Sequence, residues 1–150
     1  MRIAVGSDHA GYVMKVQLSE FLRSRGVDVI DVGTHSEERC DYPEYGAAVG
    51  RMVAAGEADL GLAVCGSGVG IGMAANKVPG VRAATIHDVT SARLSREHND
   101  ANVICFGERF IGPQTAVESL EAFLDAEFQG GRHAPRVAKL DALLPRITSD

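Results

Sequence analysis

Five short runs of consecutive apolar residues recur along the chain. Runs of this kind, in which polar and apolar positions do not alternate, are typical of strands buried on both faces of a parallel sheet. Amphipathic stretches separate the runs. Met14, Leu18 and Leu22, for example, are spaced four residues apart and share one face of a predicted helix. The pattern predicts strands at residues 3–6, 27–32, 60–64, 81–86 and 103–106.

Capping and turn residues mark where several helices are expected to begin. Asp41 and Glu44 have the spacing of a capping box, in which each side chain bonds the backbone N–H of the other residue. Asp88 is predicted to cap the helix after the fourth strand, and Gly112 followed by Pro113 to open the helix after the fifth. The apolar repeat of that helix after the fifth strand is formed by Val117, Leu120, Leu124 and Phe128.

The alternation of strands and helices predicts a single α/β domain over residues 1–150. We expect a three-layer α/β/α sandwich, Rossmann-like in topology, around a five-stranded parallel sheet. An extra C-terminal helix is predicted at about residues 135–144, and no strand follows it. Its apolar face, formed by Val137, Leu140 and Leu144, must pack against its own domain or against a partner subunit.

Charge and cysteine content narrow the classes of protein. The formal net charge of −5 argues against a general nucleic-acid binder and against binding to anionic membranes. No apolar run approaches the roughly 20 residues that span a bilayer. Cys40, Cys65 and Cys105 are an odd number with no Cys-x-x-Cys pair, which favours reduced thiols over disulfides or a zinc site. We therefore expect a cytoplasmic protein.

A glycine-rich segment follows the third predicted strand, with the sequence Cys-Gly-Ser-Gly-Val-Gly-Ile-Gly at residues 65–72. Alternate glycines let the backbone approach a ligand closely and leave N–H groups free at a helix start, where the dipole favours an anion. The dinucleotide fingerprint Gly-x-Gly-x-x-Gly fails because Ile71 and Met73 occupy the third-glycine positions, and no P-loop is present. The segment predicts an anion-binding loop without a nucleotide signature.

Cys65 begins this loop and has two interpretations. A helix N-terminus stabilises the thiolate form of a cysteine, which would make Cys65 a usable base or nucleophile. A cysteine at the end of a buried strand can equally be a small apolar core residue. Cys40 and Cys105 lack such a setting, and for them a filling role is the better interpretation.

Two pairs that contain a histidine lie at predicted element ends. Asp8 and His9 follow the first strand, where Asp8 could accept hydrogen bonds from hydroxyls and His9 could bind phosphate or transfer a proton. The alternative is a helix cap beside a solvent-facing histidine. His98 and Asn99 close the helix after the fourth strand, where a histidine is also a favourable C-terminal cation.

Arginines and the other histidines complete the candidate residues. Arg132 and Arg136 are four residues apart in a locally basic stretch, and guanidinium pairs suit phosphate, although the pair can also be a solvated helix start. His35, His87 and His133 show no metal-ligand spacing. We therefore predict no metal site.

Taken together, these segments closely resemble the sugar-phosphate isomerase family that contains ribose-5-phosphate isomerase B and the galactose-6-phosphate isomerase subunits. The resemblance extends from residue 1 to about residue 140. The residues that carry it are Asp8-His9-Ala10-Gly11, the 65–72 loop continuing into Ala74-Ala75-Asn76-Lys77, His98-Asn99, Arg109, Arg132 and Arg136.

The resemblance implies an isomerase without metal or cofactor. Its reaction would interconvert D-ribose 5-phosphate and D-ribulose 5-phosphate, a step of the pentose phosphate pathway, through a cis-enediolate. The family pattern makes Cys65 the base that moves the proton between C1 and C2, and His98 the acid and base that opens the furanose ring. Some members instead use a glutamate at the position of Ile71 and lack the cysteine, so this chain is similar to the cysteine-base subtype.

The resemblance also implies substrate-binding roles. Ser67, where many members have threonine, would help to shuttle the proton between O1 and O2, and Asp8 and Asn99 would grip hydroxyls. Members of the family are homodimers, or tetramers, in which the other subunit completes each site. The anion hole is expected from the N–H groups of Gly66, Ser67, Gly68, Val69 and Gly70, and the phosphate site from His9, Arg109, Arg132 and Arg136.

Two other functions stay open on the sequence alone. The same chemistry could act on a six-carbon sugar phosphate, allose 6-phosphate or galactose 6-phosphate, because pocket depth depends on contacts that a sequence does not reveal. The chain could also be a non-catalytic domain that binds a phosphorylated ligand. The missing nucleotide signatures count against this second function.

Overall fold

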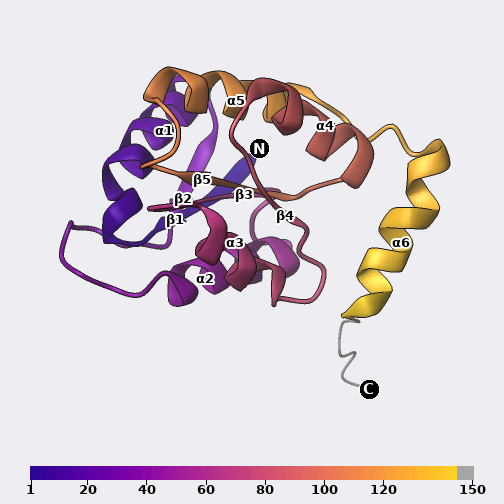
Figure 1. The fold of residues 1–150 in the computed structure, drawn as a ribbon, viewed down its shortest axis with the longest axis horizontal. Coiled ribbons are helices and arrows are strands. Elements are labelled where there is room, and N and C mark those ends of the chain that lie inside the picture. Colours follow the sequence, from indigo (N-terminus) through magenta and orange to yellow (C-terminus); the bar gives the residue numbers. More distant parts are fainter. Residues whose placement is uncertain (145–150) are drawn as a thin grey trace.

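A five-stranded parallel sheet forms the centre of the computed structural model, which describes residues 1–144. Its strands lie in the order β2-β1-β3-β5-β4, with helices on both faces (Figure 1). This arrangement confirms the predicted three-layer α/β/α sandwich. The strands are β1 (Arg2–Ser7), β2 (Asp28–Asp31), β3 (Leu60–Cys65), β4 (Ala83–Thr85) and β5 (Val103–Gly107).

The helices divide between the two faces of the sheet (Figure 1). One face is covered by α1 (Tyr12–Ser24), α4 (Val89–Asn99) and α5 (Pro113–Asp125), and the other by α2 (Tyr42–Ala54) and α3 (Val69–Asn76). Two 3-10 turns, η1 (His9–Gly11) and η2 (Gly131–His133), precede α1 and the peripheral helix α6 (Ala134–Leu143). Within residues 1–144, no helix combines the length and the apolar character needed to cross a membrane.

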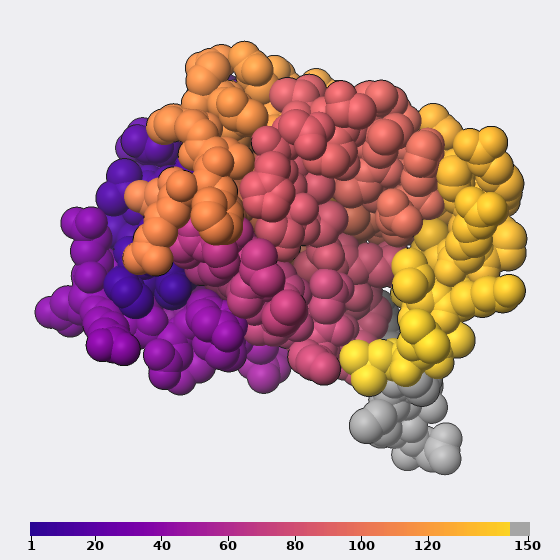
Figure 2. Space-filling view, in the orientation of Figure 1, coloured from indigo at the N-terminus to yellow at the C-terminus, as the bar shows by residue number. Residues whose placement is uncertain are grey.

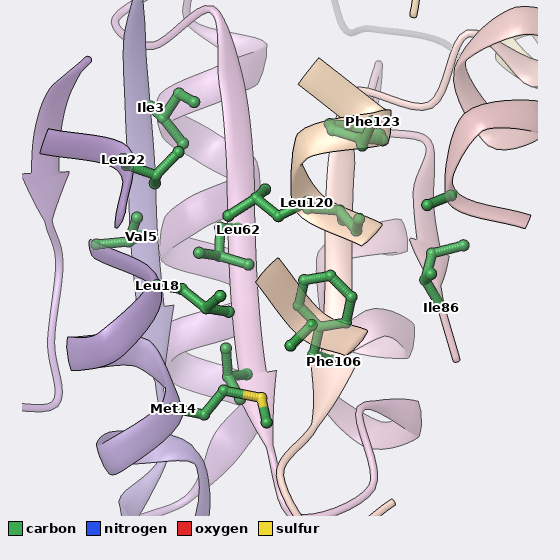
Figure 3. Close-up of a cluster of buried hydrophobic side chains, with 14 of the residues drawn as sticks. Ile3, Val5, Met14, Leu18, Leu22, Leu62, Ile86, Phe106, Leu120 and Phe123 are labelled. Carbon is green, nitrogen blue, oxygen red and sulfur yellow. The ribbon is translucent and has the colours of Figure 1, made fainter. Parts of the chain in front are cut away.

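The apolar core lies in two layers, one on each side of the sheet. Figure 3 shows the layer beneath α1 and α5, where Leu18 and Leu120 pack beside Leu62 of β3 and Phe106 of β5. Each such side chain contributes about 1.5–3 kcal/mol when fully buried. The strands β1, β3 and β5 are buried on both faces, as predicted. The residues of β2 and β4 are half-buried or exposed, because each edge strand has a neighbour on one side only.

Helix boundaries confirm some predicted caps and correct others. Asp88 caps α4 by accepting a hydrogen bond from the backbone N–H of Ser91 at 2.8 Å, and the bonds from Ser91 lower the pKa of Asp88. The capping box at Asp41 is wrong. Asp41 does occupy the N-cap of α2, but its side chain makes no capping bond: Pro43 removes one of the two N–H groups that an N-cap side chain can bond, and the N–H of Glu44 is not bonded by Asp41 either. The prediction that Phe128 belongs to the apolar repeat of α5 is also wrong, because this helix ends at Asp125.

The helix α6 stands apart from the sheet, at the outer edge of the molecule (Figure 1). In Figure 2 it forms a yellow ridge along that edge. Val137 is buried, whereas Leu140 is 47% exposed, Leu143 80% and Leu144 42%. Of the apolar face of α6, residues 1–144 therefore bury Val137 alone, and the leucines stay exposed for another contact.

Candidate active site

The predicted site residues after β1 and β3 meet at one edge of the sheet. These two strands are neighbours, and the chain leaves them toward opposite sides of the sheet. Ligands of open parallel sheets bind at the carboxyl ends of strands where the strand order reverses in this way. The backbone N–H of Asp8 donates to the carbonyl of Val64 at 3.2 Å, which joins the segment after β1 to the end of β3.

Asp8 caps the first turn and also lines the pocket described below. Its Oδ1 atom accepts hydrogen bonds from the backbone N–H groups of Ala10, at 3.0 Å, and Gly11, at 3.1 Å. The capping interpretation is therefore correct. The other carboxylate oxygen makes no hydrogen bond to residues 1–144, so the cap leaves it available for a ligand.

The main chain of Cys40 holds the ring of His9. His9 Nδ1 lies 3.1 Å from the carbonyl oxygen and 3.2 Å from the backbone nitrogen of Cys40. Because Nδ1 faces this main chain, Nε2 is the ring nitrogen left to meet a ligand. His9 is half-buried and lines the pocket, which differs from the solvent-facing alternative.

The thiol of Cys65 is buried but has a polar neighbour. Only 3% of Cys65 is exposed, and the backbone N–H of Gly68 donates to Cys65 Sγ at 3.1 Å. Cys65 also contributes to the wall of the pocket. Cys65 also belongs to the apolar layer between the sheet and the helices α2 and α3, so the core interpretation holds, while the N–H at its sulfur and its place in the pocket wall are what the chemical interpretation requires.

The backbone N–H groups of the glycine loop fall into two sets. Two of them are already used: that of Gly68 on Cys65 Sγ, and that of Val69 on Ser67 Oγ at 3.2 Å. The N–H groups of Gly66, Ser67 and Gly70 have no hydrogen-bond partner among residues 1–144. The same three residues line the pocket, and Gly68 and Val69 do not. The donors available to an anion are thus three of the five expected.

These residues enclose a pocket of about 440 Å³, which is large enough for a small phosphorylated sugar. Arg109 reaches it from the segment after β5, and its Nη1 atom lies 3.0 Å from the point where a Cβ on Gly66 would stand. The glycine thus makes room for the guanidinium beside the loop. The walls are formed by Asp8, His9, Ala10, Tyr42, Cys65, Gly66, Ser67, Gly70, Arg109 and Phe110.

Sequence reasoning missed the two aromatic residues of this pocket. The ring of Tyr42 packs on the loop, and a Cβ at Gly70 would lie 2.6 Å from Tyr42 Cζ. Phe110 is 62% exposed at the rim. The one available signal was the position of Phe110 directly after Arg109, because Tyr42 lies in a segment of the sequence with no feature of a site.

A second group of predicted residues lies away from this pocket. His98 and Asn99 end α4, and Arg132 and Arg136 belong to η2 and α6; none of the four lines the Cys65 pocket. Asn99 instead borders a separate cavity of about 460 Å³ between β4, α4 and α6. Within residues 1–144, no carboxylate forms an ion pair with Arg132 or Arg136.

His133, which showed no signal in the sequence, belongs to this second group. Its ring stacks on that of His98, with centroids 4.3 Å apart and an interplanar angle of 13°. Burial lowers the pKa of His133, and the positive potential of His98, Arg132 and Arg136 lowers it further. The group therefore concentrates cationic and histidine side chains, a composition that suits an anion.

The remaining cysteines match their predicted filling roles. Cys105 is fully buried in β5, and burial, followed by the neighbouring Cys65, raises the pKa of its thiol. Cys40 is half-buried and contributes its main chain to His9. Among residues 1–144, no cluster of three or more His, Cys, Asp or Glu side chains is arranged to hold a metal ion.

Known proteins resemble this chain closely. Among curated sequences, ribose-5-phosphate isomerase B of Escherichia coli is 48% identical over 97% of each chain. Galactose-6-phosphate isomerase subunit LacB of Clostridium acetobutylicum is 42% identical over 96% of this chain and 84% of the other. D-erythrulose-4-phosphate isomerase of Pectobacterium atrosepticum is 39% identical over 93% of each.

Solved structures of proteins with the same names also resemble this chain. Ribose-5-phosphate isomerase B of Clostridium thermocellum superposes with a TM-score of 0.94 at 51% identity, over 95% of this chain and 97% of the other. The type B enzyme of Trypanosoma brucei gives a TM-score of 0.91 at 46% identity with the same coverage. Residues 3–140 match the family described as Ribose/Galactose Isomerase. The chain belongs to this family of sugar-phosphate isomerases.

Proposed function

We propose that the chain interconverts D-ribose 5-phosphate and D-ribulose 5-phosphate through a cis-enediolate, with Cys65 as the base. The observation that carries the proposal is the pocket in which Cys65 lies beside the N–H groups of Gly66, Ser67 and Gly70, which have no hydrogen-bond partner in the described part of the chain. The high identity to enzymes named ribose-5-phosphate isomerase B supports the choice of substrate.

The reaction moves one proton between neighbouring carbons. The Cys65 thiolate removes the proton from C2 of the open-chain aldose and returns it to C1, so that the carbonyl passes from C1 to C2. The enediolate formed between these two steps carries negative charge on oxygen. A positioned general base contributes typically about 100- to 10,000-fold to such a rate.

The free loop N–H groups of Gly66, Ser67 and Gly70 stabilise that charge. Donors fixed in place before the reaction cost no reorganisation as charge develops, and losing one typically costs about 100- to 1000-fold in rate. The hydroxyl of Ser67 accepts a hydrogen bond from Val69, which leaves its own proton free to move between O1 and O2. Asp8, through its unused carboxylate oxygen, grips a sugar hydroxyl.

A second copy of the chain completes the site. The ring opener His98 and the cations Arg132 and Arg136 lie outside the Cys65 pocket of their own chain, so we place them in the pocket of a partner subunit. Together with His9 and Arg109 of the first chain, the arginines hold the phosphate, while Asn99 grips a hydroxyl. Most soluble homo-oligomers are two-fold symmetric, and two sites of this kind would then form in a homodimer, or in a tetramer built from two such dimers.

Exposed apolar side chains support this assembly. Met73 is 63% exposed and Val69 44% on the outer face of α3, beside the glycine loop. Leu143 and Leu140 are exposed on α6. The free thiols of the described chain suit a reducing compartment, and we place the protein in the cytoplasm.

A six-carbon substrate is the second candidate, because a galactose-6-phosphate isomerase subunit is among the similar proteins. Side-by-side kcat/KM values on ribose 5-phosphate and allose 6-phosphate separate the two. We expect the purified chain to form ribulose 5-phosphate with the higher kcat/KM. A higher kcat/KM on the hexose phosphate would assign a six-carbon substrate instead. Tight binding of either sugar without turnover would indicate a non-catalytic domain.

A further inference from the structure

Gly68 is the residue of the glycine loop whose conformation decides the contact to Cys65. Its N–H is the donor directed at Cys65 Sγ, and its backbone is left-handed, with φ of +76°. A Cβ at this residue would lie 2.8 Å from the carbonyl carbon of Phe106 and 2.9 Å from the nitrogen of Gly107, so a side chain is excluded. Glycine fits the position but brings wide conformational freedom, and a rotation here would turn the N–H away from the sulfur.

The end of β5 fixes the part of the loop that precedes Gly68. The backbone N–H of Glu108 donates to the carbonyl of Cys65 at 2.9 Å, and that of Arg109 donates to the carbonyl of Gly66 at 3.0 Å. Neither bond acts on the peptide that follows Gly68, whose carbonyl accepts the first helical hydrogen bond of α3 from the N–H of Gly72 at 3.2 Å. The N–H of that peptide bonds Ser67 Oγ, which belongs to the same loop and moves with it.

A side chain from β4 adds a second hydrogen bond to the same carbonyl. Thr85 Oγ1 donates to the carbonyl oxygen of Gly68 at 3.0 Å. Among residues 1–144, Thr85 is the one side chain outside the loop that hydrogen-bonds the loop backbone between residues 65 and 70. Gly72 makes the contact possible, because a Cβ there would lie 2.8 Å from Thr85 Oγ1.

We propose that Thr85 is a positioning residue for the isomerisation: by holding the carbonyl of Gly68 it limits rotation of this glycine, so that the N–H on the preceding peptide stays directed at Cys65 Sγ. The inference rests on the role proposed above for Cys65 as the base. An N–H directed at sulfur stabilises the thiolate more than the thiol, because hydrogen bonds to charged acceptors are the stronger ones. Loss of the Thr85 hydroxyl therefore leaves less thiolate at a given pH. Substrate binding is unaffected, because Thr85 does not line the pocket.

The test compares Thr85→Val, which keeps the shape and removes the donor, with Thr85→Ser, which keeps the donor. Thr115→Val, at a half-buried position of α5, is the matched control. Two quantities are measured: kcat and KM on ribose 5-phosphate, and the pH midpoint of iodoacetamide alkylation at Cys65, followed by mass spectrometry of its peptide. The alkylation readout requires no isomerase activity.

For Thr85→Val we expect kcat to fall about 10-fold, which is about 1.4 kcal/mol, with KM unchanged. The alkylation midpoint should rise by roughly half to one pH unit, since one unit corresponds to 1.36 kcal/mol. Thr85→Ser should restore both quantities, and Thr115→Val should alter neither. Should Thr85→Val not fold, Thr85→Ala tests the same expectation.

A wild-type alkylation midpoint in the variants without the hydroxyl would overturn the inference. So would equal losses in Thr85→Val and Thr85→Ser, because these would reflect packing. Failure of the proposed function is distinguishable: if Cys65→Ala remained active, Cys65 would not be the base, yet the alkylation midpoint would still report whether Thr85 directs the N–H of Gly68.

Discussion

The two groups of candidate residues differ in how the fold supports them. The Cys65 pocket lies at the carboxyl ends of the central strands, and backbone hydrogen bonds from neighbouring segments hold its loop. The His98 group lies on the end of α4, on η2 and on α6, a helix whose leucines remain exposed. One group is thus preorganised by the sheet, whereas the other is a peripheral surface without a complete pocket of its own.

The difference matches a division of chemical labour. Proton transfer at carbon needs a base and oxyanion donors held to within a fraction of an ångström, and the sheet edge provides such rigidity. Ring opening and phosphate binding depend on charged side chains, which can be supplied from the surface of another subunit. We infer that substitutions of Cys65 and of the loop donors act on kcat, and that those in the second group act on ring opening, on KM or on assembly.

The largest effect is expected for Cys65→Ala. Loss of the base should lower kcat about 1000-fold or more while leaving sugar-phosphate binding nearly intact. Steady-state kinetics and titration calorimetry measure the two quantities. The control is Cys105→Ala, which removes a fully buried thiol from the neighbouring strand and should keep a near-normal kcat. A Cys65→Ala variant with near-normal kcat would remove the cysteine from the mechanism.

A smaller loss, and one that depends on the substrate, is expected for His98→Asn. If His98 opens the ring, kcat on ribose 5-phosphate should fall about 100-fold. Erythrose 4-phosphate cannot close a furanose ring, because its phosphate occupies O4, and its turnover should be affected far less. Parallel assays of both sugars provide the comparison, and equal losses on both would contradict the ring-opening role.

Arg136→Ala should act mainly on KM. A charge-assisted hydrogen bond contributes about 1.5–3 kcal/mol, so its loss should raise KM about 10- to 100-fold with little change in kcat. Arg93→Ala, which removes an exposed arginine of α4 that pairs with Glu97, is the control. A fall in kcat at unchanged KM would place Arg136 at the reacting carbons instead of at the phosphate.

The smallest expected effect concerns stability in mild acid. The pKa of His133 is lower in the folded chain than the ordinary value of 6.5, so the unfolded chain binds more protons below that pH. Stability contributed by neutral His133 should therefore be complete above about pH 6.5 and decrease as the pH falls toward 5. Melting temperatures across this range should show the decrease, and His133→Phe should weaken it. The control is His87→Gln, which changes an exposed histidine. If the melting temperature depended on pH equally in wild type and in His133→Phe, another group would be responsible for the effect.

Most of the fold could be predicted from the sequence, because strands and helix starts are marked by local patterns of residues. Apolar runs identified the five strands, and Asp88 and Gly112 marked helix starts that the structure confirms. The errors came from context: Asp41 makes no capping bond although Glu44 has the right spacing, and edge strands are less buried than central ones. These features depend on the exact helix register and on the strand order, which a pattern of residue types does not contain.

Site residues could be predicted from the sequence where they form contiguous motifs, but not where they reach the site through long-range contacts. The glycine loop and Asp8-His9 stood out by spacing, and the structure brings them into one pocket. Tyr42 and Thr85 gave no signal, because each reaches the loop from a distant segment of the chain. The sequence also could not show which two of the five loop N–H groups are used within the loop itself.

Complementation between two inactive variants tests the shared site most directly. Cys65→Ala and His98→Asn chains are each purified, mixed, unfolded and refolded together, and assayed on ribose 5-phosphate. If each site combines Cys65 of one chain with His98 of the other, every mixed dimer regains one intact site, and the mixture should recover about a quarter of wild-type activity. Mixing Cys65→Ala with Arg109→Ala should add nothing, because both changes lie in the pocket of one chain. A Cys65→Ala and His98→Asn mixture with no more activity than its separate components would contradict the account.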